Sequence, residues 1–187
     1  MRILFLGDVM GRSGRRAIGD RLAPLRERLK ADLVVVNAEN ASGGRGVTAG
    51  HAQLLLDSGA DCLTLGDHAF DQKDLLSYVE REPRIIRPLN YAREAPGRGH
   101  AVVEDRRGRK VLVAQALGQV FMSRPYDDPF SALDTVLRAH EQSLRVLFAA
   151  LQNKRGPAKR LLAYEVFLGF LRKLDLVQVR KYYMVIT

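Results

Sequence analysis

Residues 31–40, ADLVVVNAEN, decide how this chain folds, because an unbroken apolar run ends there directly in polar residues. A run of Leu and Val without alternation is typical of a strand that is covered on both faces, as in a parallel sheet with helices packed on it. The stretch therefore predicts a buried strand, with Glu39 and Asn40 just beyond its carboxyl end.

The segments on either side alternate between strand-like and helix-like patterns. Strands are predicted over 2–9, 31–39 and 61–67, and helices over 14–30, 48–60 and 71–83. Thr48 is a typical helix cap, and Gly59 a typical stop. Repeated strand–helix order favours an α/β fold with a mostly parallel sheet and helices on its faces.

The pattern changes after the third predicted helix, which Pro83 ends. Two strands joined by a tight connection predict a hairpin, and a helix opened by Ser131 follows. Further helices are predicted over 141–153 and 157–174, with a last strand over 177–186. We expect residues 1–140 to form one domain, followed by a divergent, basic and mainly helical segment over residues 141–187.

Composition limits the class of protein. With 47% hydrophobic and 27% charged residues, the chain is typical of a globular protein in water. Its apolar runs are too short to cross a bilayer, and the amino terminus lacks a signal-peptide pattern, so we expect a cytoplasmic protein without membrane contact. The single cysteine, Cys62, lies in an apolar run, which predicts a buried thiol and excludes a cysteine-rich zinc site.

The net charge of +9 is unevenly distributed, since residues 141–187 carry +6 of it. Such a basic tail could attract nucleic acid or an anionic partner. The simpler explanation, which stays open, is a solvated helical face rich in arginine.

Polar residues follow each of the first three predicted strands. Asp8, the pair Glu39–Asn40, and the pair Asp67–His68 all lie at or near a carboxyl strand end, where α/β proteins bind ligands. Any one of them alone is explained by turn formation or helix capping. Together they favour a metal centre, because carboxylates and amide oxygens bind hard or borderline divalent and trivalent cations.

The chemistry that such a centre suits is phosphoryl transfer. Two metal ions about 3.5–4 Å apart can hold both the attacking and the leaving oxygen. His68, directly after a candidate ligand, is suitably placed as a general acid, although a hydrogen-bonded structural histidine is the alternative. The glycine-rich stretches over 7–16 and 40–48 lack phosphate-loop spacing, which disfavours a simple nucleotide-binding module.

Six stretches of the sequence resemble those of the YmdB-like metallophosphoesterases, which are similar to 2′,3′-cyclic-nucleotide phosphodiesterases. They are ILFLGDVMGRSGR, NAENASGGRGVT, LTLGDHAFDQKD, RIIRPLNY, PGRG and LGQVFM…DDPF, in the family's order and within residues 1–140. The resemblance implies a sheet sandwich flanked by helices, here shortened and ending in the basic helical segment. It also implies hydrolysis of a small phosphodiester or cyclic nucleotide by hydroxide held between two metal ions, with iron or manganese expected.

The resemblance also implies roles for single residues. Asp8 corresponds to a ligand of the first metal with Asn40 beside it, and Glu39 to the carboxylate shared by both metals. Asp67 stands where the family usually has a ligand asparagine, and this change keeps an oxygen ligand while adding negative charge. His68 corresponds to the catalytic proton donor.

One departure from the family opens an alternative function. The family's later segments, similar to DFHAE and GTHTHV, supply metal-binding histidines, whereas the histidines of this chain are His51, His68, His100 and His140. The alternative is a catalytically impaired or truncated relative that binds RNA or a partner protein through its basic tail. An uncovered sheet edge would also favour a homo-oligomer.

Overall fold

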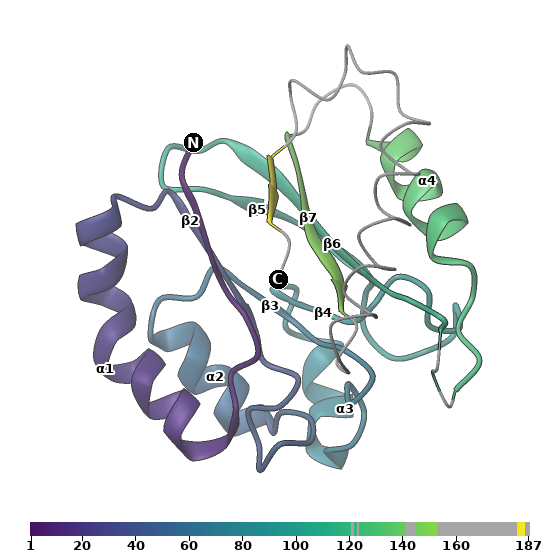
Figure 1. Ribbon diagram of the computed structural model, residues 1–187, viewed down its shortest axis with the longest axis horizontal. Coiled ribbons are helices and arrows are strands. Elements are labelled where there is room, and N and C mark those ends of the chain that lie inside the picture. Colours follow the sequence, from purple (N-terminus) through teal and green to yellow (C-terminus); the bar gives the residue numbers. More distant parts are fainter. Residues whose placement is uncertain (121, 123, 141–144, 153–182, 186–187) are drawn as a thin grey trace.

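The computed structural model describes residues 1–120, 122, 124–140, 145–152 and 183–185, which form two sheets packed face to face (Figure 1). The first sheet is parallel and has the order β1 (Ile3–Leu6), β2 (Leu33–Asn37), β3 (Cys62–Thr64) and β4 (Ile85–Ile86). The second has the order β5 (His100–Glu104), β6 (Lys110–Leu117), β7 (Arg145–Gln152) and β8 (Tyr183–Val185).

Helices cover the outer faces of the two sheets, so that the chain is layered helix, sheet, sheet, helix. The helices are α1 (Gly11–Leu29), α2 (Ala49–Asp57), α3 (Lys73–Val79) and α4 (Pro129–Ala139). The first three pack on the first sheet, and α4 packs on β6 of the second (Figure 1). The predicted α/β sandwich flanked by helices is confirmed.

Strand β2 shows why residues 31–40 have this pattern. It pairs with β1 on one side and β3 on the other, and none of its side chains has exposed surface. Val34 and Val36 pack against the helices, whereas Leu33 and Val35 pack between the sheets. Because both faces are buried, both alternating sets of side chains must be apolar.

The hairpin of β5 and β6 is confirmed as an antiparallel pair. On β6, Val111 and Val113 face the first sheet, whereas Leu112 and Ala114 face α4. Strand β6 therefore lies at the centre of the second sheet's packing, as β2 does in the first.

The helix predicted over 141–153 is wrong, because residues 145–152 form strand β7 instead. This strand pairs in parallel with β6 and with β8. A short apolar run such as RVLFAALQ fits a buried strand as well as a helix, and its neighbours in the fold decide between them. Strand β8 agrees with the strand predicted over 177–186, and the helix predicted over 157–174 lies outside the described residues.

The start of α4 differs from the prediction. Asp128, not Ser131, is the capping residue, and its carboxylate accepts hydrogen bonds from the backbone N–H groups of Phe130 (3.4 Å) and Ser131 (2.9 Å). Pro129 then occupies the first turn, where its missing N–H costs nothing. Ser131 has a supporting role, because its hydroxyl also donates to Asp128.

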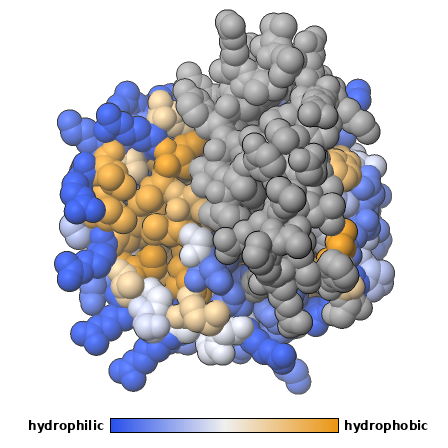
Figure 2. All heavy atoms as spheres, in the orientation of Figure 1, coloured by the Kyte–Doolittle hydropathy of each residue, from blue (hydrophilic) through white to orange (hydrophobic). Residues whose placement is uncertain are grey.

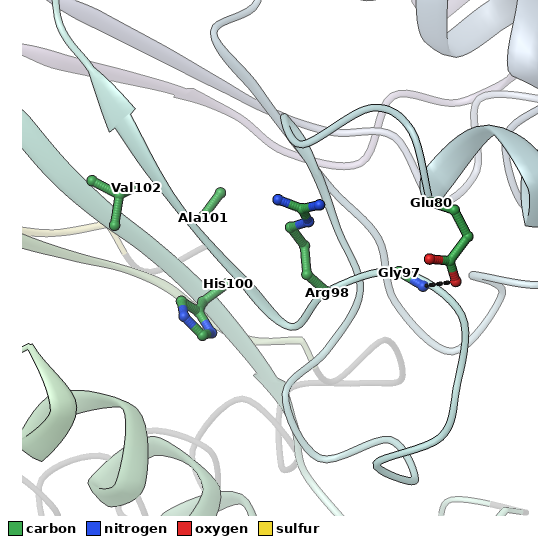
Figure 3. Close-up of a pocket in the computed structure, with 6 residues that line it drawn as sticks. All are labelled: Glu80, Gly97, Arg98, His100, Ala101 and Val102. Carbon is green, nitrogen blue, oxygen red and sulfur yellow. Dashed lines mark hydrogen bonds between the residues drawn. The ribbon is translucent and has the colours of Figure 1, made fainter.

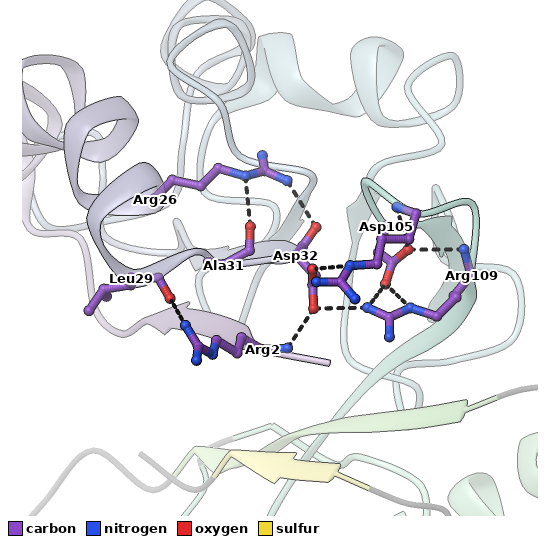
Figure 4. Close-up of polar contacts among 8 residues, drawn as sticks. Arg2, Arg26, Leu29, Ala31, Asp32, Asp105 and Arg109 are labelled. Atoms are coloured by element: carbon purple, nitrogen blue, oxygen red, sulfur yellow. Dashed lines mark hydrogen bonds and ion pairs between the residues drawn. The ribbon is translucent and has the colours of Figure 1, made fainter.

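A charged network ties the β5–β6 hairpin to the connection between α1 and β2 (Figure 4). The Asp105 carboxylate accepts from the side chain of Arg109 at 2.6 Å and from the backbone N–H groups of Arg107 and Arg109, each at 2.9 Å. Arg109 also donates to Asp32 at 2.8 Å, and Asp32 accepts from the backbone N–H of Arg2 at 2.8 Å. Both sheets are thus joined at the end opposite the carboxyl ends of the first sheet.

Strand β1 is an outer strand of its sheet. Figure 2 shows apolar side chains gathered over this part of the molecule, consistent with the partly buried Leu4, Phe5 and Leu6. Within the described part of the chain, no helix is long and apolar enough to cross a membrane.

Candidate active site

The loops that follow β1, β2 and β3 meet at one edge of the first sheet, because these strands are parallel and neighbouring. Backbone hydrogen bonds join the loops. Val9 N–H donates to the Asn37 carbonyl at 3.0 Å, and Ala38 N–H donates to the Thr64 carbonyl at 2.9 Å. The three predicted groups of polar residues therefore extend from adjacent, mutually bonded loops.

Asp8 and Asn40 are in direct contact across two of these loops. The Asn40 side-chain amide donates to the Asp8 carboxylate. Asp8 is exposed and has a φ of 48°, a left-handed conformation that is uncommon for residues other than glycine. Backbone strain of this kind clusters at functional sites, where surrounding contacts hold it in place.

The carboxylates of Glu39 and Asp67 both raise the pKa of the buried Tyr126. Glu39 has no exposed surface, while the Asp67 side chain is 31% exposed. Burial raises the pKa of the Tyr126 hydroxyl, and the negative charges of Asp67 and Glu39 raise it further. A buried carboxylate is costly unless its charge is compensated, so the completely buried Glu39 depends on its polar contacts.

His68 is oriented by a carboxylate that follows it in the same loop. Its Nδ1 lies 2.7 Å from Asp71 Oδ2, and its Nε2 lies 3.9 Å from Asp67 Oδ2. Because a carboxylate accepts, this contact assigns the donated proton to Nδ1 and leaves Nε2 for another partner. The imidazole is 26% exposed, so a ligand at this edge can reach it.

Three residues from distant parts of the chain support the Asp67–His68 loop. The Tyr91 hydroxyl donates to the carbonyls of Gly66 (3.0 Å) and Asp67 (3.1 Å). Its ring contacts that of Tyr126, with centroids 5.0 Å apart. Arg124 donates to the Asp67 carbonyl at 3.4 Å and lies 3.6 Å from Asp71 Oδ1.

Asn90 joins this edge to the second sheet. Its side-chain amide donates to the carbonyls of Leu117 (2.8 Å) and Asp127 (3.0 Å), and its side-chain oxygen accepts from Leu117 N–H at 2.8 Å. The amide is fully buried. Two of the three bonds join the exit of β4 to the last residue of β6, and the third joins it to the chain after β6. The two sheets are thus fixed to each other beside the candidate site.

The chemistry of the donors suits a metal ion, but the set is incomplete. Asp8, Glu39, Asn40 and Asp67 offer the oxygen atoms that hard and borderline cations prefer. However, no three His, Cys, Asp or Glu side chains in the described part of the chain form a group that could hold a metal ion. A metal ion at this edge would therefore need ligands beyond the side chains of the described residues.

Known proteins resemble this chain over most of its length. A family model described as "YmdB-like protein" matches residues 4–166. The 2′,3′-cyclic-nucleotide 2′-phosphodiesterase of Bacillus subtilis (strain 168) is 35% identical over 137 residues, which are 73% of this chain and 51% of that protein. The chain thus spans about half the length of the curated relatives it matches.

Two crystal structures share the fold. A hypothetical protein from Thermus thermophilus has a TM-score of 0.76 and 36% identity, covering 91% of this chain and 63% of that one. A novel phosphatase from Mycoplasma pneumoniae has a TM-score of 0.72 and 31% identity, covering 90% and 60%. Since the family model extends over most of the sequence and the fold agrees, this chain belongs to the family of YmdB-like proteins.

Proposed function

We propose that this chain is a metal-dependent phosphodiesterase acting on a small phosphodiester, with cyclic nucleotides as the first substrates to test. One observation carries the proposal: His68, held by Asp71, lies beside Asp67 at the sheet edge that also bears Glu39 and Asp8. The names of the Bacillus and Mycoplasma relatives support the same class of reaction.

His68 would act as the proton donor to the leaving oxygen. Asp71 accepts the Nδ1 proton and so fixes both the ring orientation and the tautomer. The Nε2 atom is then the one left to donate, and the imidazole is partly exposed, so the leaving oxygen of a bound phosphodiester would have to come within hydrogen-bond reach of it. A donor in this position removes the cost of expelling an alkoxide, which is a poor leaving group.

Asp8, Glu39, Asn40 and Asp67 would hold the metal ions, with iron or manganese the expected occupants. Two such ions would neutralise charge on the phosphoryl oxygens and lower the pKa of the attacking water. Glu39 would be the shared ligand, because it follows β2, the strand that lies between β1 and β3, which lead to Asp8 and Asp67.

Arg124 would position the substrate. Its side chain is 54% exposed, yet it contacts both Asp71 and the Asp67 carbonyl. This places a guanidinium at the rim of the site, where it can pair with a phosphate oxygen.

The direct test is hydrolysis by the purified chain. After treatment with a chelator, we expect no cleavage of bis(p-nitrophenyl) phosphate or of 2′,3′-cyclic AMP, and recovery when Mn²⁺ or Fe²⁺ is added. Failure of every metal to restore cleavage in folded protein would contradict the proposal. If the chain cleaved bis(p-nitrophenyl) phosphate but not 2′,3′-cyclic AMP, it would be a phosphodiesterase for which 2′,3′-cyclic AMP is not a substrate.

Asp71→Asn should lower turnover by about 10²-fold for alkoxide leaving groups, because the imidazole loses its orienting carboxylate. Asp74→Asn is the matched control, since Asp74 lies three residues further on and its carboxylate accepts from the Ala49 backbone N–H, at 2.9 Å. Steady-state kinetics of both variants on 2′,3′-cyclic AMP and on a p-nitrophenyl ester would measure the change in turnover. An equal loss on both substrates would point to a structural role for Asp71 instead.

Gly46→Ala should disturb the His68 loop, whereas Gly43→Ala should not. Both glycines have left-handed backbones, with φ of 70° and 66°, so each variant should lose about 1–2 kcal/mol of stability. Only at Gly46 would the new Cβ lie 3.0 Å from the His68 carbonyl oxygen, while the space beside Gly43 is open. Urea unfolding would measure the loss of stability in both variants, and turnover would measure the disturbance of the His68 loop. Equal turnover in the two variants would contradict the predicted disturbance at Gly46.

A further inference from the structure

Two histidines outside the candidate active site face each other across the second sheet and α4. His100 begins β5, and His140 follows the last turn of α4. Their Nε2 atoms are 3.4 Å apart, and their ring centroids are 5.3 Å apart. Neither imidazole makes another side-chain hydrogen bond within the described part of the chain.

The pair lies on the opposite face of its sheet from the first sheet. Ala101 packs between the two sheets, so the alternation along β5 turns His100 the other way. His100 is paired with Ala114, which packs on the α4 side. This location is therefore distinct from the edge that bears Glu39 and Asp67.

We propose that His100 and His140 form a binding site for a borderline divalent cation, with Zn²⁺ as the reference ion. In a tetrahedral Zn²⁺ site with Zn–N bonds of about 2.0–2.1 Å, two ligand nitrogens lie about 3.3–3.4 Å apart. The observed separation of 3.4 Å already matches this spacing. Water would fill the remaining positions, since the described chain offers two nitrogen ligands here.

Burial of His100 suits this assignment. It lowers the pKa of the ring, which favours the neutral imidazole that metals bind, and the nearby His140 and Arg98 lower it further, although the charge of Arg98 also repels a cation. A pocket of about 430 Å³ opens beside His100 and is lined by Glu80, Gly97, Arg98, Ala101 and Val102 (Figure 3). His100 is itself one of the residues that line this pocket.

The nitrogen ligands also give this site a different metal preference from that of the candidate active site. Imidazole favours Zn²⁺, Ni²⁺ and Cu²⁺, whereas carboxylate and amide oxygens favour Mn²⁺ and Mg²⁺. A cation bound by both rings would link the end of α4 to the start of β5. The site would therefore act on the packing of α4 and leave the phosphodiester chemistry to the other edge.

The test is a Zn²⁺ titration of the chelator-treated chain, followed by long-range ¹H–¹⁵N spectra of the histidine rings. We expect the Nε2 signals of His100 and His140 to shift together along one saturation curve, whatever Zn²⁺ the edge bearing Glu39 and Asp67 also binds. In competition with a chromophoric chelator, His100→Gln and His140→Gln should each weaken this binding at least tenfold. His51→Gln is the matched control, because His51 instead contacts the Ser42 hydroxyl, at 2.6 Å.

The result that overturns the proposal is equally direct. If Zn²⁺ leaves the two ring signals unchanged, or if the double variant binds as the wild type does, the pair is only a structural contact. The spectra of the unaltered chain decide this even if a variant folds poorly.

Discussion

The His68→Ala variant is expected to hydrolyse 2′,3′-cyclic AMP about 10²- to 10⁴-fold more slowly than the unaltered chain, because the leaving alkoxide loses its proton donor. The loss should be much smaller for a p-nitrophenyl ester, whose leaving group needs no proton. We expect His68 to be the proton donor because its Nδ1 lies 2.7 Å from Asp71 Oδ2, which orients the ring and leaves Nε2 available. Turnover at saturating substrate and metal measures the effect.

His51→Ala is the control for this variant. His51 is also partly buried and hydrogen-bonded, but to the Ser42 hydroxyl rather than to a carboxylate. Its replacement should leave the ratio of the two turnover rates unchanged. If His68→Ala reduced both substrates equally, His68 would be a structural or binding residue and not the proton donor.

Asp105→Asn should lower the free energy of unfolding at neutral pH by about 3 kcal/mol, since it removes one side of a buried charged network. The Asp105 side chain has no exposed surface, and Arg109 donates to it at 2.6 Å. Urea unfolding measures the loss. Glu27→Gln is the control, because the Glu27–Arg106 pair is exposed and should contribute less than about 1 kcal/mol.

The same network predicts how stability depends on pH. Burial alone would raise the pKa of Asp105, but hydrogen bonds from the Arg109 side chain and from the Arg109 and Arg107 backbones outweigh it, so the pKa is lowered. The pKa of Asp32 is also lowered, chiefly by the hydrogen bond from the Arg2 backbone. A lowered pKa stabilises the fold above the ordinary value of 3.8, and this stabilisation is lost as the pH falls through the lowered value.

The difference between Asp105→Asn and the unaltered chain should therefore be constant from about pH 5 to about pH 7, and it should shrink below about pH 4. An equal difference at neutral pH and at about pH 2.5 would show that the charge of Asp105 does not stabilise the fold. Unfolding curves at the two pH values settle the point.

Three strands of the first sheet, β1, β2 and β3, could be predicted from the sequence because their signals are local. The run Leu33–Val36 and the cap at Thr48 each specify their own element. Strand β7 could not be predicted, because its apolar run becomes a strand only through pairing with β6 and β8. Strand β4 was also missed, since Ile85 and Ile86 are too short a run to show a period.

The residues of the candidate site also fall into those with a local sequence signal and those that only the fold brings together. Asp8, Glu39 and Asp67 could be found because each follows a recognisable strand. Asp71 had a weaker local signal, its spacing of three residues from His68. Tyr91 and Arg124 had none, because they reach the Asp67 loop from 24 and 57 residues away and only the packed fold brings them there.

The burial of β2 has a consequence for amide hydrogen exchange. Its residues have no exposed surface, and its backbone pairs with strands on both sides. Solvent can reach the amide protons of Val34, Val35 and Val36 only when the whole sandwich opens, so their exchange rates report the global free energy of unfolding. The exposed loop at Asp8 can exchange through local opening, which leaves the candidate catalytic edge free to adjust around a substrate while the strand that supports it stays closed.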